Sequence, residues 1–306
     1  MISVVVPVYK GEAYLAELTD RLVDSLRGVD EYEIIYVDDR GPDDSWNVIS
    51  TLCSRFKEVK GIRHSRNFGQ HPAIHTGLLA ALGDWIVVMD CDLQDLPEEI
   101  PRLLQHAVET KSDIVTAFRS SRKDSIYRKV MSSLFYWLFN YLTGFNQPHQ
   151  VANFGIYSRR SVQAVLSLGD YIRFLPLQMS WVGFASSCVE VQHGKREQDS
   201  SGYSFFSLLN LALETIITFS DRPMRLAIQI GVMVCLTAFA YGLYTIYGYL
   251  TGRITVLGFA SLVLSIWILS GIIIGLIGVV GLYVGKMFNQ TKQRPISIVE
   301  ERLNVE

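Results

Sequence analysis

The N-terminal part of the chain alternates short apolar runs with amphipathic stretches. The apolar runs, rich in β-branched residues, are ISVVVPVY, EIIYVDD, GIRHS, WIVVMD and DIVTAF. The amphipathic stretches between them lie near residues 12–27, 43–57, 71–82 and 97–110. This alternation of strand and helix patterns predicts an α/β domain in which helices cover both faces of a mainly parallel sheet.

The C-terminal third has a different pattern, in which two apolar stretches follow each other almost without interruption. They cover residues 226–250 and 257–284, and Arg253 is the only charged residue from 226 to 285. About 20 apolar residues suffice for a helix to cross roughly 30 Å of hydrocarbon, so we expect a two-helix transmembrane hairpin. Neither span contains an acidic or basic residue, which favours a role as an anchor over one as an ion pathway.

Glycines recur in the second span at steps of three and four residues. They are Gly271, Gly275, Gly278, Gly281 and Gly285. Small residues at this spacing allow close helix contact, either within the hairpin or between protomers of a homo-oligomer.

Basic residues around the hairpin indicate its orientation. Those outside the spans are Arg222, Arg225, Lys286, Lys292 and Arg294, whereas the short loop 251–255 carries Arg253 alone. Because cytoplasmic flanks carry the excess of Lys and Arg, we expect an integral protein of the cytoplasmic membrane with both termini and the α/β domain in the cytoplasm. The start MISVVVPVYKG lacks the basic segment of a signal peptide.

Composition and missing motifs argue against several other classes of protein. The four cysteines form no CxxC pair and no spacing typical of a metal site. A formal net charge of −2 and the lack of an arginine-rich run argue against nucleic-acid binding. No GxGxxG follows the first strand and no GxxxxGK[ST] occurs, so neither a dinucleotide fingerprint nor a P-loop is present.

Acidic side chains follow directly on the fourth apolar run, in VVMDCDLQDLPEE at residues 87–99. Ligands of open α/β sheets bind beyond the carboxyl ends of the strands, where Asp90, Asp92 and Gln94 are expected to lie. Their oxygens suit Mg²⁺ or Mn²⁺, which bind one or two carboxylates while bridging diphosphate oxygens. The sequence therefore predicts a metal and diphosphate site here.

Two neighbouring acidic groups have an alternative interpretation. Asp95, with Glu98 three residues on and Pro97 between them, forms the pattern of a helix capping box, so we expect Asp95 to start the next helix. Asp38 and Asp39, in YVDDRGPDDS, belong either to a ligand pocket or to a solvated turn.

Three longer motifs and the two apolar spans carry a resemblance to a known family. The motifs are VVPVYKGEAYL, YVDDRGPDDS and SRNFGQHPAIHTGLLAALGDWIVVMDCDLQDLPEE. The chain resembles the family 2 glycosyltransferases of GT-A fold that load sugars onto polyprenyl phosphates, such as dolichyl-phosphate mannosyltransferases and bactoprenyl-phosphate glucosyltransferases. The resemblance covers essentially the whole chain, and DxDLQDxPE is much more specific than a bare DxD. It implies a mixed GT-A sheet, a nucleotide sugar donor, with a UDP-sugar favoured, and a divalent cation.

The resemblance also implies donor-side roles for individual residues. Asp90, Asp92 and Gln94 correspond to the metal and diphosphate cluster. Arg66, Asn67 and Gly69 match an RNxG turn that packs over the donor, for which a plain surface turn is the alternative. The residues expected to bind the nucleotide sugar are Pro7, Tyr9, Glu12, Asp38, Asp39, Arg66, Asn67, Asp90 and Asn153.

On the acceptor side, the resemblance implies a cluster of arginines that meets the lipid phosphate, because guanidinium groups suit phosphate oxygens. The acceptor residues are Arg119, Arg122, Arg128, Arg196, Ser201 and Tyr203. The residues expected to be catalytic are Asp92, Arg119, Arg128 and Arg196. The alternative for RSSRKDSIYRK is a solvated linker or a contact with anionic headgroups.

The sequence departs from the family pattern at two places. Asn153 and Gly155 stand where relatives commonly have the aspartate and arginine of GDFRLxxR, and Asp199 and Gly202 replace the glycine and lysine of RxxGxSKYS. An amide cannot act as a general base. A phosphate acceptor is already anionic near neutral pH, however, so its attack on the sugar C1 needs no deprotonation by the protein.

The expected domain organisation follows from these patterns. Residues 1–203 form the cytoplasmic GT-A catalytic domain, 226–285 the hairpin and 286–306 a cytoplasmic tail. The aromatic-rich segments 132–144 and 204–225 are expected to be helices at the membrane interface, with buried core helices as the alternative.

We interpret the chain as an inverting glycosyltransferase that moves a hexose-type sugar onto polyprenyl (undecaprenyl) phosphate. A processive polysaccharide synthase would carry QxxRW and more spans, whereas QMSW at 178–181 lacks the arginine. A catalytically silent membrane scaffold is favoured by Asn153 and Gly202, and the intact acidic segment opposes it.

Overall fold

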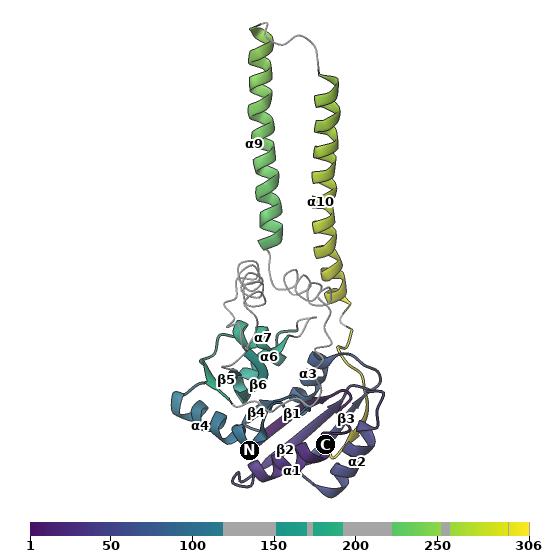
Figure 1. The fold of residues 1–306 in the computed structure, drawn as a ribbon, viewed down its shortest axis with the longest axis vertical. Helices are drawn as coiled ribbons and strands as arrows, with labels where there is room; N and C mark the ends of the chain where they lie inside the picture. The colour runs from purple at the N-terminus through teal and green to yellow at the C-terminus, as the bar shows by residue number, and fades with distance from the viewer. Residues whose placement is uncertain (119–150, 170–173, 192–221, 252–257, 293, 306) are drawn as a thin grey trace, which may run out of the picture. The chain divides into compact units, whose positions relative to one another are not determined.

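The computed structural model describes residues 1–118, 151–169, 174–191, 222–251, 258–292 and 294–305 (Figure 1). The acceptor residues Arg119, Arg122, Arg128, Arg196, Ser201 and Tyr203 lie outside these ranges. So do the expected interface helix 132–144 and residues 204–221 of the expected interface helix 204–225. The chain divides into two compact units. One is an α/β unit that includes the C-terminal residues Arg294–Glu306, and the other contains the two long apolar helices.

The α/β unit follows the predicted alternation of strands and helices. Its strands are β1 (Ile2–Val8), β2 (Tyr32–Asp38), β3 (Val59–His64), β4 (Trp85–Val88), β5 (Ile114–Phe118), β6 (Val151–Ser158), β7 (Ser186–Glu190) and β8 (Val299–Leu303). Its helices are α1 (Leu15–Ser25), α2 (Ser45–Arg55), α3 (Gln70–Ala80), the 3₁₀ turn η1 (Pro97–Glu99), α4 (Ile100–Thr110), α6 (Arg159–Leu166) and α7 (Leu175–Trp181).

The described strands form one mixed sheet in the order β7-β5-β6-β4-β1-β2-β3-β8. Strands β1, β2, β3 and β4 pair in parallel, as do β5 and β7, whereas β6 and β8 run antiparallel to their neighbours. The carboxyl ends of β1, β2 and β4 therefore lie side by side. Strands β4 and β1 are at the centre of the sheet. This arrangement confirms the expected mixed α/β sheet flanked by helices.

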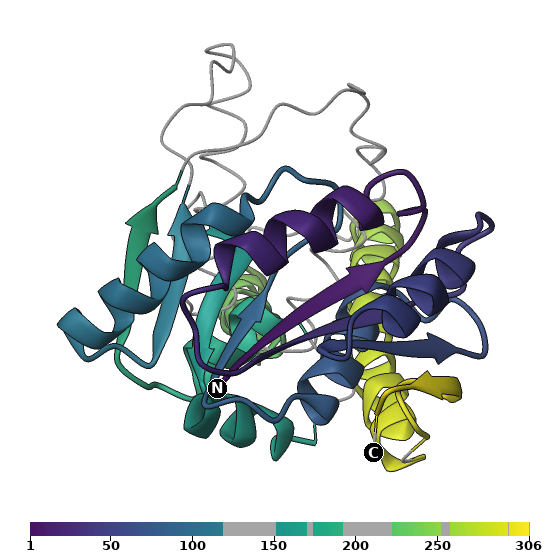
Figure 2. The same cartoon turned by 90° about the horizontal axis from the view of Figure 1, so that it is seen from below.

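Each face of the sheet has its own apolar core (Figure 2). Helices α1, α2 and α4 cover one face, where Leu18 and Ile49 are fully buried. Helices α3, α6 and α7 cover the other face, where Ile74 and Val165 are buried. Burial of both faces explains why the central strands read as nearly continuous apolar runs rather than as alternating ones.

The helical unit contains α9 (Arg222–Leu250) and α10 (Phe259–Thr291). Windows Ala227–Tyr244 and Ile268–Phe288 are long and apolar enough to cross a membrane, and their residues are not buried by protein. A Cβ added at any of the five glycines from Gly271 to Gly285 would meet no atom of the described residues within 4 Å. Close packing within the described hairpin therefore does not use this glycine face.

The segment after the second apolar helix, expected to be a cytoplasmic tail, contains a strand that was not predicted. Its residues Val299–Leu303 form β8, an edge strand that pairs antiparallel with β3. The sequence VEERL has no apolar alternation, so periodicity could not identify it. Main-chain pairing with β3 holds this strand. The residue after it is also fixed, because the side-chain amide of Asn304 donates to the backbone carbonyls of Cys53 and Val59 at 2.8 and 2.9 Å.

Candidate functional site

The acidic segment forms a loop directly after β4, at the carboxyl end of a central strand. Cys91 points inward, where its Sγ lies close to Gly11: a Cβ on Gly11 would be 3.2 Å from that sulfur and 2.9 Å from Val8 Cγ1. Burial raises the pKa of the Cys91 thiol to about 12, and the neighbouring Asp90 adds to the shift. Cys91 is therefore a protonated packing residue, and the flanking Asp90 and Asp92 remain half-buried.

Hydrogen bonds fix the shape of this loop. Leu93 adopts the left-handed region with φ 59°, which lets the backbone N–H of Gln94 donate to Asp92 Oδ1 at 3.2 Å. The side-chain amide of Gln70, at the start of α3, donates to Asp90 Oδ1 at 2.6 Å. The loop is thus held both by its own backbone and by the neighbouring helix.

Asp95 has a different role from the expected helix cap. The turn η1 has Leu96 at its N-cap and α4 has Glu99, and neither makes a side-chain capping bond. Asp95 is buried, and its Oδ2 accepts a 3.2 Å hydrogen bond from the backbone N–H of Asp90. The capping-box prediction is therefore wrong: Asp95 braces the loop rather than starting a helix.

The side-chain oxygens of this loop fit a divalent cation that a substrate helps to bind. Asp90, Asp92 and Gln94 contribute carboxylate and amide oxygens, the ligands that Mg²⁺ and Mn²⁺ prefer. Among the described residues no group of three or more His, Cys, Asp or Glu side chains could hold a metal alone. A site with one or two carboxylates leaves coordination positions for phosphate oxygens and water, as is usual for Mg²⁺.

Reciprocal hydrogen bonds join the loops that follow β1 and β2. The backbone N–H of Glu12 donates to Asp43 Oδ2, and the backbone N–H of Asp44 donates to Glu12 Oε2, each at 3.1 Å. Ser45 adds a second link, since its hydroxyl donates to Asp43 and accepts from the N–H of Gly11. Glu12, expected to bind the donor, therefore uses one carboxylate oxygen to hold the two loops together.

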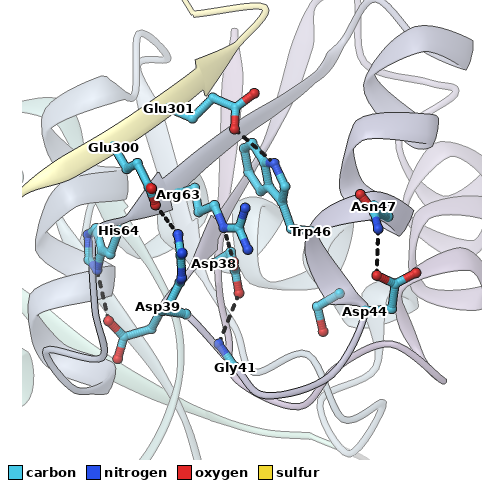
Figure 3. A network of polar contacts seen from close by, with 12 residues as sticks. Asp38, Asp39, Gly41, Asp44, Trp46, Asn47, Arg63, His64, Glu300 and Glu301 are labelled. Atoms are coloured by element: carbon cyan, nitrogen blue, oxygen red, sulfur yellow. Dashed lines mark hydrogen bonds and ion pairs between the residues drawn. The ribbon is translucent and has the colours of Figure 1, made fainter.

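Asp38 and Asp39 are both buried, in distinct surroundings (Figure 3). Asp38 Oδ2 lies 3.3 Å from Arg63 Nε, and its Oδ1 accepts a 3.4 Å bond from the N–H of Gly41. Burial raises the pKa of the Asp38 carboxyl, and the hydrogen bond from Gly41 and the charge of Arg63 oppose that rise. The solvated-turn alternative does not describe either residue.

Asp39 holds the turn that contains the Arg66–Gly69 motif. Its carboxylate accepts from the backbone N–H groups of Phe68 at 2.9 Å and Gly69 at 2.7 Å, and His64 Nδ1 lies 2.8 Å from the same group. Gly69 has φ 105°, a conformation that favours glycine. The turn is therefore anchored from beneath, with Arg66 exposed over the Phe68 ring at 4.2 Å.

The remaining residues that were predicted to bind the nucleotide sugar lie on the side of the sheet where β1, β2 and β4 end. Pro7 is buried within β1, Tyr9 follows the strand with 49% of its surface exposed, and Asn67 is exposed in the anchored turn. Asn153 belongs to β6, two residues before Gly155, which pairs with Val88 of β4. The strands and loops that carry the predicted donor-side residues thus place them on the same side of the sheet.

Sequence reasoning missed several residues that shape this site. Gln70, Arg63 and His64 contact Asp90, Asp38 and Asp39. Arg63 and His64 lie in a predicted strand, and Gln70 directly precedes a predicted helix, so neither pattern marked them as site residues. The pairing of adjacent parallel strands offered a signal for Arg63, which pairs with Asp38 in register. Glu300 and Glu301 also reach this region, and nothing in the sequence pattern indicated them.

Comparisons with known proteins agree with the motif assignment. The model of "Glycosyl transferase family 2" matches residues 3–166. The chain is 34% identical over 302 residues to a prophage bactoprenol glucosyl transferase homolog of Escherichia coli (strain K12), covering 98% of each chain. It is 30% identical to an undecaprenyl-phosphate 4-deoxy-4-formamido-L-arabinose transferase of Pectobacterium carotovorum, covering 99% of this chain and 94% of that one.

Among solved structures, a glucosyl-3-phosphoglycerate synthase from Mycobacterium tuberculosis, in complex with Mn²⁺, UDP and phosphoglyceric acid, is 21% identical with a TM-score of 0.49. That similarity covers 71% of this chain and 76% of the other. The family model spans more than half of the chain, and the relatives above match nearly all of it. The chain therefore belongs to glycosyl transferase family 2 and is a glycosyltransferase.

Proposed function

We propose that this chain transfers a hexose-type sugar from a UDP-sugar to undecaprenyl phosphate at the cytoplasmic face of the membrane. The observation that carries this proposal is the Asp90–Gln94 loop, which offers two half-buried carboxylates at the carboxyl end of a central strand. Relatives named as bactoprenol and undecaprenyl-phosphate sugar transferases match nearly the whole chain, including the two apolar helices, and support the choice of acceptor.

Asp90, Asp92 and Gln94 are the residues that would hold a divalent cation, Mg²⁺ or Mn²⁺. When bound, such a cation neutralises the charge that develops on the leaving diphosphate. The protein itself fixes the geometry: Gln70 and the N–H of Gln94 orient the Asp90 and Asp92 carboxylates before the donor arrives. Ligands held in this way need little rearrangement during the reaction.

The turns after β1 and β2 are the proposed nucleotide side of the site. Tyr9 is exposed there, and Asp38 offers a carboxylate that can accept from a ring N–H of uracil or from a ribose hydroxyl. Glu12 and Asp39 hold these turns in place through backbone N–H groups. We assign them to positioning of the pocket.

The acceptor side rests on residues outside the described ranges. We propose that Arg119, Arg128 and Arg196, helped by Arg122, Ser201 and Tyr203, hold the lipid phosphate in line with the sugar. An oxygen of that phosphate forms a bond to the anomeric carbon while the bond from that carbon to the nucleotide diphosphate breaks. A single displacement of this kind inverts the anomeric centre, and it needs no base, so Asn153 in place of an aspartate is compatible with activity.

The connectivity of the two units supports a membrane hairpin. β8 follows the second apolar helix and pairs with β3, which precedes the first, so both flanks of the hairpin join one folded unit. The chain must then cross the membrane an even number of times, with both flanks on the same face. The excess of basic residues on those flanks favours the cytoplasmic face.

Transfer of radiolabelled sugar to undecaprenyl phosphate tests the proposed function directly. The full chain in detergent is incubated with a panel of nucleotide sugars, with Mn²⁺ or with EDTA, and the lipid product is extracted. We expect product with a UDP-hexose and its loss in EDTA. The absence of a metal-dependent lipid product with every common nucleotide sugar would contradict the proposal and favour a silent scaffold.

A further inference from the structure

The C-terminal strand β8 carries two consecutive carboxylates that reach the candidate nucleotide turn. In the pairing with β3, Val299 lies opposite His64 and Glu301 lies opposite Arg63, so Glu300 is an additional residue in the strand. An extra residue of this kind forms a β-bulge, which re-aims side chains and is frequent at sheet edges beside functional sites. The bulge places the Glu300 and Glu301 carboxylates near the end of β2 (Figure 3).

Glu300 pairs with the guanidinium of Arg40, in the turn formed by residues 38–41. Arg40 has φ 54°, a left-handed conformation that non-glycine residues adopt at a cost and keep when the surroundings impose it. The adjacent Gly41 donates its N–H to Asp38 Oδ1. The ion pair between Arg40 and Glu300 therefore holds the conformation of the turn that carries the Asp38 carboxylate.

Glu301 supports the same turn through a second series of contacts. Its Oε2 accepts a 3.1 Å hydrogen bond from the indole N–H of Trp46, which is only 7% exposed. The guanidinium of Arg63 lies 5.5 Å from the centre of the Trp46 ring, within the range of a cation–π contact. The Nε of Arg63 in turn lies 3.3 Å from Asp38 Oδ2. Glu300 and Glu301 are thus linked to Asp38 by two separate series of contacts.

Stability alone does not account for the Glu300 pair. The side chains of Arg40 and Glu300 are 40% and 45% exposed, and ion pairs at such exposure add little to folding. The pair has a more direct effect on the conformation of the turn at residues 38–41. Without Glu300, the Arg40 side chain would no longer anchor the turn, and its charge would be free to approach Asp38 or Asp39. Because the pair is exposed and contacts the turn at residues 38–41, its removal is expected to change ligand binding rather than unfolding.

We propose that Glu300 and Glu301 are positioning residues for the nucleotide part of the donor, Glu300 acting through Arg40 and Glu301 through Trp46 and Arg63. This inference rests on the proposed function in assuming that the turn at residues 38–41 binds the nucleoside diphosphate. It assigns a role in donor binding to a strand that follows the second apolar helix in sequence.

The test compares Glu300→Gln and Glu301→Gln in the full-length protein with Arg302→Gln as the matched control. Arg302 lies on the same strand opposite Ile62, so it tests for general loss of the edge strand. Affinity for UDP with Mn²⁺ is measured by calorimetry, and donor KM and kcat are measured with the best UDP-sugar. For Glu300→Gln we expect weaker UDP binding and a higher donor KM, each about five- to tenfold, with kcat and the thermal midpoint nearly unchanged. The Arg302→Gln control should bind UDP like the wild type.

A charge exchange provides the sharper readout. Arg40→Glu alone should weaken UDP binding, and the double variant Arg40→Glu with Glu300→Arg should recover much of it, since the pair is restored in reverse. Wild-type UDP affinity in Glu300→Gln, or equal losses in Arg302→Gln, would overturn the inference. If the wild type transfers no sugar to lipid phosphate, the proposed function fails, while the UDP titrations still decide whether β8 positions the nucleotide turn.

Discussion

The side-chain amide of Gln70 donates a 2.6 Å hydrogen bond to Oδ1 of Asp90, and this bond joins the start of α3 to the acidic loop after β4. We predict that Gln70→Ala leaves the fold intact and raises the Mn²⁺ concentration needed for half-maximal transfer about tenfold, because residues that orient metal ligands affect metal affinity on this scale. Metal titration of the transfer rate measures the effect.

Gln105→Ala is the matched control for that prediction. Gln105 makes a similar bond, to Glu109, on the exposed side of α4, away from the acidic loop. An unchanged metal requirement in Gln70→Ala, or a comparable change in Gln105→Ala, would show that the Gln70 bond does not orient Asp90 for a metal.

Asp92→Asn provides a direct test of the metal assignment. The amide oxygen of asparagine can still accept from the N–H of Gln94, so the loop conformation is expected to persist while the negative charge is lost. We predict that the transfer rate falls by a factor of about 100 or more, the scale found when a group that stabilises developing charge is removed. Membrane insertion and the thermal midpoint should not change.

The control for charge removal is Asp24→Asn, which breaks an exposed pair with Arg27 at the C-terminal end of α1. Its transfer rate should match that of the wild type. Wild-type turnover in Asp92→Asn would remove Asp92 from the metal site and leave Asp90 and Gln94 as the remaining candidates.

The sequence was sufficient to predict those parts of the fold in which local pattern and burial agree. Buried parallel strands read as apolar runs, so β1, β2 and β4 could be located together with the polar residues that follow them. Strand β8 could not, because its charged residues obtain their partners only in the folded chain, as Glu301 does with Trp46.

Residue type alone could not separate ligand-facing carboxylates from structural ones. Asp39 and Asp95 occur in the same acidic motifs as Asp38 and Asp92, yet Asp39 accepts from backbone N–H groups of a neighbouring turn and Asp95 accepts from the backbone N–H of Asp90 in its own loop. The bonds of Asp39 depend on how loops distant in sequence approach each other. The prediction that Asp95 caps a helix failed because the Asp95 carboxylate accepts from the backbone N–H of Asp90 in its own loop, a local side-chain bond that competes with capping.

Glu33, at the start of β2 and therefore far along the strand from the candidate site, is predicted to contribute strongly to the stability of the fold. It is 2% exposed, pairs with Lys60 at 2.7 Å, and accepts from the hydroxyl of Ser3 and the N–H of Leu82. Glu33→Ala leaves the buried Ser3 hydroxyl and the mostly buried Lys60 ammonium without this carboxylate, so we expect a loss of about 3–5 kcal/mol in the free energy of unfolding.

Unfolding in urea, followed by tryptophan fluorescence in detergent, measures the Glu33 effect. Glu33→Gln should lose less, because its amide oxygen can still accept one bond. Glu58→Ala, at an exposed position just before β3, should remain close to the wild type. A small loss in Glu33→Ala, similar to that of Glu58→Ala, would contradict the prediction.

His71 is predicted to make the protein sensitive to mild acid. It packs edge-on against Phe174 with ring centres 4.8 Å apart, and burial lowers its pKa from 6.5 to about 4. The unfolded chain therefore binds a proton that the folded chain does not between these two values. Above pH 6.5 the imidazole is neutral in both states and adds no pH dependence, whereas between pH 6.5 and 4 the free energy of unfolding falls by about 1.4 kcal/mol for each pH unit.

The variant His71→Phe keeps an aromatic ring against Phe174 and removes the titrating group. Thermal midpoints of the wild type and the variant are compared from pH 7.5 to pH 4.5, so that the difference isolates His71 from the acidic residues that titrate in both. We expect the midpoint of the wild type to fall more steeply below pH 6.5 than that of the variant. Parallel curves for the two proteins would mean that His71 is protonated as readily in the folded chain as in the unfolded one.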